Sequence, residues 1–95
     1  MIERITKNEE RLDKIQDSIK SLQDSLEKFK NNKKDLYLLK KYYGSKNWFK
    51  DKETYENKKI PKIKAGVLSE DTVWNTLEDI DELCNEMKII VKEFN

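Results

Sequence analysis

The first third of the chain places an apolar residue at every third or fourth position, and this pattern constrains the fold most. The run extends from Ile5 to Leu36, with Asn8 and Lys33 as its polar members. Such a 3-4 alternation is typical of a long amphipathic helix whose apolar stripe packs against another helix. Its apolar members are Ile5, Leu12, Ile15, Ile19, Leu22, Leu26, Phe29 and Leu36. The sequence predicts a helix over about residues 2–43, with a bend or break in the polar segment 30–35.

A second helix is predicted over about residues 69–94. Ser69 is a good N-cap, and Leu68 and Val73 have the spacing of a hydrophobic staple. The apolar positions then follow one another at intervals of four and three. They are Val73, Leu77, Ile80, Cys84, Met87, Val91 and Phe94.

The connection over about residues 44–68 is predicted to be irregular and partly helical, with a short helix near residues 47–55. Gly44 is a natural end for the first helix, because glycine readily adopts the left-handed conformation that follows a helix. We therefore expect an all-α protein in which two long amphipathic antiparallel helices form a single domain over residues 1–95.

Assembly with further copies follows from the length and composition. Of the 95 residues, 41% are charged and 36% are hydrophobic, and a chain this short has only a small core of its own. Two helices of unequal length leave part of each apolar stripe uncovered. We expect a homo-oligomer, a dimer or a tetramer, with the tetramer favoured.

Catalytic and metal chemistry has little support in the sequence. There is no histidine and one cysteine, Cys84, which excludes zinc clusters, Ser-His-Asp triads and an intramolecular disulfide. The acidic residues between Glu70 and Glu82 are expected to form a solvated helix face. We predict a protein that is not an enzyme, needs no cofactor or metal, lacks a membrane span and resides in the cytoplasm.

The net charge is only +1, so the chain as a whole does not strongly attract nucleic acid or a membrane surface. Lysine runs occur at residues 30–34 and 58–64, and acidic residues are taken to interleave with them. These runs are expected to serve solubility and helix pairing, so nucleic acid is not an expected partner.

Aromatic residues gather beside lysines where the first helix ends. Six of the nine aromatics lie between residues 37 and 55. Tyr42 and Tyr43 point about 100° apart on a helix and cannot both face one core. Phe49 and Trp74 are expected in the core. The cluster fits either a small core or a pocket in which rings stack on bases and arginines contact phosphates.

The segments "MIERI", "RLD", "YYGS" followed by a tryptophan, and "GVLSED" resemble a family of small bacterial and phage proteins catalogued as a domain of unknown function. The chain also resembles phage sponge proteins that sequester the cyclic oligonucleotide signals of bacterial CBASS immunity. Those sponges are oligomeric and non-catalytic, and they bind cyclic dinucleotides such as 3′3′-cGAMP in pockets shared between subunits.

The resemblance implies a ligand site formed by the matching motif residues. They are Arg4, Arg11, Tyr42, Tyr43, Gly44, Ser45 and Trp48. The tyrosines or Trp48 would stack on bases, the arginines would contact phosphates, and Ser45 would hydrogen-bond a base edge or phosphate. The alternative is a helical adaptor or inhibitor that binds another protein through its heptad faces.

Overall fold

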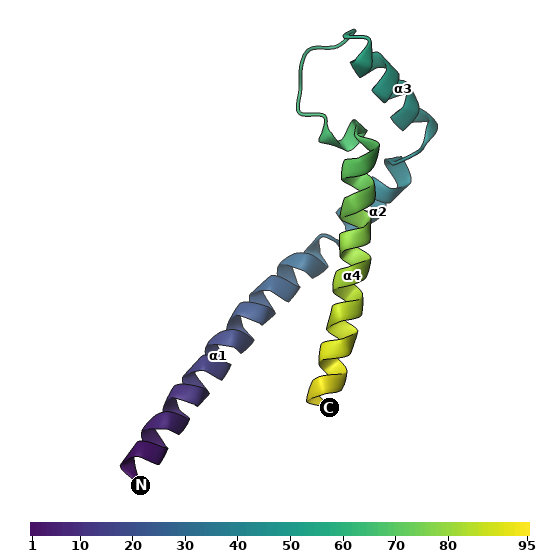
Figure 1. Cartoon of the computed structure of the whole chain (residues 1–95). Coiled ribbons are helices and arrows are strands. Elements are labelled where there is room, and N and C mark those ends of the chain that lie inside the picture. Colours follow the sequence, from purple (N-terminus) through teal and green to yellow (C-terminus); the bar gives the residue numbers. More distant parts are fainter. The chain divides into compact units, whose positions relative to one another are not determined.

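The computed structural model describes all 95 residues and is entirely helical, without strands (Figure 1). Its elements are α1 (Ile2–Asn31), α2 (Lys33–Tyr42), α3 (Lys46–Glu56), the 3₁₀ helix η1 (Gly66–Leu68) and α4 (Glu70–Phe94). The prediction of an all-α chain with two long helices is confirmed. The chain divides into two compact units, residues 1–39 and 40–95, and antiparallel packing and homo-oligomer assembly stay predictions.

The first unit contains α1 and most of α2. The helix predicted over residues 2–43 is divided at Asn32, inside the polar segment where a bend or break was expected. The N–H group of Asn32 donates to the carbonyl of Phe29 at 3.1 Å, and the N–H group of Leu36 donates to the carbonyl of Asn32 at 2.9 Å. Asn32 thus ends one helix and begins the next.

No residue of α1 is buried. The apolar stripe predicted from the heptad pattern lies open along the helix, with exposed fractions from 37% at Phe29 to 58% at Leu22. A helix of 30 residues is about 45 Å long, and most of the stability of such helices comes from packing one face. The stripe of α1 therefore has no packing partner within its own unit.

In the second unit, η1 packs against both α3 and α4. Its buried apolar residues are Trp48, Leu68 and Val73. Leu68 and Val73 bracket the start of α4 in the positions of a hydrophobic staple, as the sequence predicted. The core of this unit is thus small and lies at the N-terminal end of α4, while α4 runs on beyond it (Figure 1).

Two serines and one glycine fix the element boundaries of the second unit. Ser45 caps α3, accepting a hydrogen bond from the N–H group of Trp48 at 3.2 Å. Ser69 caps α4, accepting from the N–H group of Thr72 at 3.4 Å. Gly44 has φ of +75°, the left-handed conformation in which glycine is favoured, just after α2 ends. The predicted cap at Ser69 and helix end at Gly44 are confirmed.

Candidate functional site

Five of the seven predicted site residues lie together where α2 turns into α3. We call residues 42–48 the aromatic corner; it holds Tyr42, Tyr43, Gly44, Ser45 and Trp48. The N–H group of Ser45 donates to the carbonyl of Tyr42 at 3.0 Å, which closes the turn around Gly44. The aromatic corner is therefore a turn between two helices that is closed by a hydrogen bond of its own backbone.

Trp48 is the centre of the core of this unit, with 3% of its surface exposed. Its indole N–H donates to the carbonyl of Val67 at 2.9 Å. The ring of Tyr43 meets it edge-on with centroids 5.2 Å apart, and the ammonium of Lys52 lies 5.1 Å from its centroid. Trp48 thus ties α3 to the segment before α4, and a direct contact between Trp48 and a ligand stays a prediction.

The two tyrosines of the corner are half-buried and use their hydroxyl groups in different ways. The Tyr42 hydroxyl donates to Oδ2 of Asp51 at 2.7 Å, whereas the Tyr43 hydroxyl donates to the carbonyl of Glu70 at 3.2 Å. The hydrogen bond to Asp51, with burial and the carboxylate charge, raises the pKa of Tyr42 to about 12. Tyr42 ends α2 and Tyr43 lies just after it, and the two adjacent hydroxyl groups reach different partners, as expected.

Arg4 and Arg11 lie on α1 in the first unit, where they frame Asn8. The side-chain amide of Asn8 donates to the carbonyl of Arg4 at 2.8 Å, and Nη1 of Arg11 donates to Oδ1 of Asn8 at 3.1 Å. The polar member of the heptad stripe is thereby hydrogen-bonded on its own helix. That the two arginines contact a ligand phosphate stays a prediction.

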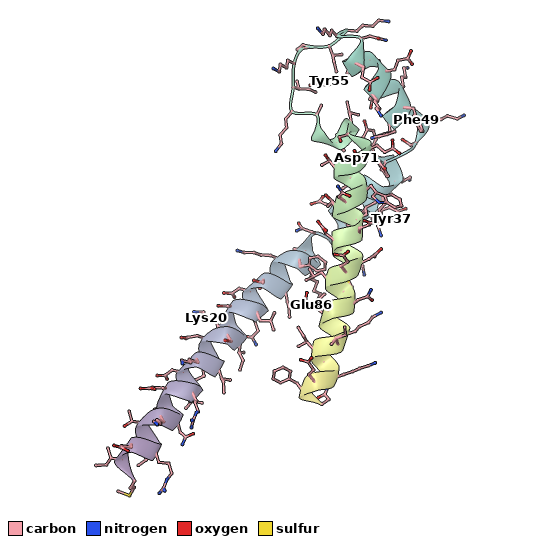
Figure 2. The ribbon with its side chains drawn as sticks, in the orientation of Figure 1. Lys20, Tyr37, Phe49, Tyr55, Asp71 and Glu86 are labelled. Carbon is pink, nitrogen blue, oxygen red and sulfur yellow. The ribbon has the colours of Figure 1, made fainter.

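The expectation that Phe49 and Trp74 belong to the core is wrong. Their exposed fractions are 60% and 56%, and Figure 2 shows Phe49 on the outer side of α3. Each has an adjacent residue, Trp48 or Val73, that points about 100° away and occupies the core. Phe49 is therefore an exposed ring beside the aromatic corner.

Charge is strongly segregated within the second unit. Residues 40–65, which we call the basic head, contain nine lysines and three acidic residues, a net charge of +6. Residues 66–95 contain two lysines and eight acidic residues, a net charge of −6. The expectation that acidic residues balance the lysine runs is therefore wrong for the head, which forms a local positive field.

A hollow of about 550 Å³ lies in the basic head after α3. Its lining consists of Tyr55, Glu56, Lys58, Ile60 and Lys62, and its volume falls in the range of small-molecule sites. Sequence reasoning noted Tyr55 among the aromatics but assigned the lysine run 58–64 to solubility. The combination of an aromatic residue with following lysines was the signal that could have identified this site.

The chain reversal after α3 forms this hollow. Lys58 adopts a left-handed φ of 57°, and its N–H group donates to the carbonyl of Tyr55 at 3.0 Å. The Tyr55 hydroxyl donates to the carbonyl of Ile63 at 3.4 Å, and Figure 2 shows Tyr55 on the side of α3 that faces the connection. Tyr55 and two lysines therefore line one hollow, the residue types that recognition of a base and a phosphate uses.

No group of three or more acidic, cysteine or histidine side chains is arranged to hold a metal ion. None of the helices combines the length and apolar character needed to cross a membrane.

Comparison with known proteins identifies a family whose model covers most of the chain. The model of a family described as a domain of unknown function (DUF4298) matches residues 5–90. No curated protein and no solved structure matches the chain. The matched range includes α2, α3 and the basic head entirely.

Proposed function

This chain belongs to the DUF4298 family, a domain of unknown function, and from its own residues we propose that it binds and sequesters an anionic cyclic oligonucleotide. The proposed ligand class is that of the CBASS signals, such as 3′3′-cGAMP. The protein would act in the cytoplasm of a bacterial cell as a phage-type immune-evasion protein.

The observation that carries this proposal is the hollow in the basic head. Tyr55, which is half-buried, lines this hollow together with two lysines, Lys58 and Lys62, and one acidic residue, Glu56. Stacking on an aromatic side chain contributes about 1 to 3 kcal/mol per base. The +6 charge of residues 40–65 attracts a ligand with two phosphates, although the whole chain carries only +1.

The mechanism is mass action without cleavage. A bound signal cannot reach its effector, so inhibition depends on the affinity and the copy number of the protein. No acid-base pair or nucleophile is assigned a role, because sequestration requires none. A homo-oligomer, with the tetramer favoured, would provide several such sites in one particle.

Thermal unfolding with a panel of cyclic di- and trinucleotides and linear controls tests the proposal. A ligand at about 100 times its dissociation constant stabilises the folded protein by about 2.7 kcal/mol. The double variant Lys58→Gln, Lys62→Gln should lose most of this shift. The matched variant Lys88→Gln, Lys92→Gln removes two lysines from α4 instead and should keep the shift.

Two results would count against the proposal. If no nucleotide of the panel shifted the unfolding temperature, cyclic oligonucleotides would be ruled out as the ligand class. An equal loss of the shift in both double variants would show that overall charge, and not the hollow, governs binding.

A second candidate function is a helical adaptor or inhibitor that binds another protein. The observation that favours it is the exposed apolar stripe of α1, a helix without a buried residue. An adaptor predicts that stripe residues such as Leu22 govern activity and that no nucleotide binds. Sequestration predicts that Leu22→Ser leaves the intrinsic nucleotide site intact.

A further inference from the structure

The apolar stripe of α1 is narrow, in contrast to that of α4. In heptad terms, Ile5, Leu12, Ile19 and Leu26 occupy a, and Asn8, Ile15, Leu22 and Phe29 occupy d. The flanking positions on α1 are polar throughout these heptads. They are Arg4, Arg11, Ser18 and Ser25 at g, and Glu9, Gln16, Gln23 and Lys30 at e. A stripe limited to a and d is the pattern of a coiled-coil seam with a single partner helix.

The stripe of α4 is wider, because apolar residues also occupy a flanking row. Leu83 and Ile90 precede the seam positions Cys84 and Val91, and both are more than 40% exposed. Such a three-row face is typical of a helix with more than one neighbour in a bundle. The stripe of α1 is narrow and has polar flanks, so a second α1 helix matches it better than the wider face of α4 does.

We propose that the stripe of α1 pairs with α1 of a second copy, parallel and in register, as a two-stranded coiled coil. The two stripes have equal lengths, so all of their seam positions overlap. The pairing rests on the proposed homo-oligomer and assigns it a surface, but it does not depend on the nucleotide.

The charges beside the seam are compatible with the parallel arrangement, and Asn8 distinguishes it from the antiparallel one. In a parallel pair, a residue at g lies near the residue five positions later on the partner, at e. Arg4 of each chain thereby meets Glu9 of the other, and Arg11 meets Gln16. None of the flanking pairs in this arrangement brings like charges together.

Asn8 supports the same register. In a parallel pair the two Asn8 side chains share one layer of the seam, where a polar residue fixes register and partner number. In an antiparallel pair with full overlap, Asn8 would face Leu26 of the partner. Its amide already bonds Arg4 and Arg11 of its own helix, and its remaining N–H and lone pair suit a second amide.

Cysteine cross-linking tests the proposal in the full chain. Cys84 is the one cysteine, so Cys84→Ser gives a thiol-free background. In this background, Leu12→Cys and Leu26→Cys should each form a disulfide-linked dimer under mild oxidation, since a disulfide requires Cα atoms within about 7 Å. Asp24→Cys lies on the outer side of α1 and is the matched control; it should remain monomeric on a non-reducing gel.

The alternatives give different gels. In a mixture of the Leu26→Cys and Asn8→Cys proteins, a disulfide between the two variants, when neither variant cross-links alone, would show an antiparallel pair and overturn the parallel one. No cross-link from either seam position, with helicity retained by circular dichroism, would overturn self-pairing. Neither result would affect the nucleotide-induced thermal shift, so the two proposals fail separately.

A charge exchange provides a second measurement. Arg4→Glu places a carboxylate against Glu9 of the partner and should raise the dimer dissociation constant roughly twofold to tenfold by sedimentation. Combining it with Glu9→Arg should restore the wild-type value. If the double variant Arg4→Glu, Glu9→Arg had the same raised dissociation constant as Arg4→Glu alone, the parallel pairing would be contradicted.

Discussion

Trp48 shows how one side chain can organise the basic head. It is the most buried residue of the second unit, and its indole N–H supplies a hydrogen bond to the segment that precedes α4. Edge-on contact with Tyr43 and the position of Lys52 over its ring add to this arrangement. We therefore assign Trp48 a positioning role for the head, whatever the ligand.

Trp48→Ala should cost about 3 to 5 kcal/mol in the free energy of unfolding, because it empties the centre of a small core. Trp48→Phe should cost less, since it keeps a ring but leaves the Val67 carbonyl without its donor. Phe49→Ala is the matched control: its ring is 60% exposed and meets the Trp48 ring only edge-on, and the expected loss is about 1 kcal/mol. Urea unfolding followed by far-UV circular dichroism measures all three, and equal costs for Trp48→Ala and Phe49→Ala would contradict the assignment.

The pair of Tyr42 and Asp51 gives a pH dependence with a definite sign. The folded protein raises the pKa of Tyr42 to about 12 from 10.0, so it retains this proton where the unfolded chain loses it. The resulting stabilisation is complete below pH 10 and disappears as the pH rises to about 12. A spectrophotometric titration should show one late tyrosine, absent in Tyr42→Phe and shifted to lower pH in Asp51→Asn. An unchanged titration in Asp51→Asn would contradict the cause.

Where two large apolar residues are adjacent, the sequence does not determine which of them is buried. The heptad pattern identified Val73 as a seam residue, yet it could not exclude Trp74 from the core. In α3, with only 11 residues, too few turns exist to fix which face is buried. Contact with the segment around Val67 and Leu68 makes that choice, and this contact is a tertiary property.

At the scale of elements, local chemistry accounts for most boundaries. Gly44 ends the helical segment before it, and Ser45 and Ser69 begin the helices after them. These residues act through hydrogen bonds within a few positions, so the sequence alone identifies Gly44 and Ser69 correctly. The family resemblance implies a ligand role for Ser45 instead, and its capping role depends on the start of α3, which the sequence defines only loosely.

Cap removal should separate these roles. Ser45→Ala should lower the free energy of unfolding by about 1 kcal/mol, because the N–H group of Trp48 loses its acceptor. Ser69→Ala should cost a similar amount at α4. Ser21→Ala, in the exposed middle of α1, is the control and should cost nothing, since alanine is the better helix former. Thermal unfolding measures the three variants, and a Ser45→Ala protein as stable as the control would contradict the capping role.

At the scale of the whole molecule, the order of the charges carries more information than their sum. The net charge of +1 conceals a segment of +6 followed by one of −6. The sequence therefore contained the basic head, but not the hollow, because Tyr55 and Lys62 share a space only after the reversal at Lys58. The heptad pattern likewise predicted an apolar stripe on α1 without naming its partner.

Calorimetric titration with the cyclic dinucleotide that stabilises the protein in the panel is the most direct test of sequestration. The account predicts saturable binding, recovery of the nucleotide intact after the protein is denatured, and loss of binding in the Lys58→Gln, Lys62→Gln variant. Recovery of a linear or hydrolysed product, or an affinity unchanged by that variant, would contradict it.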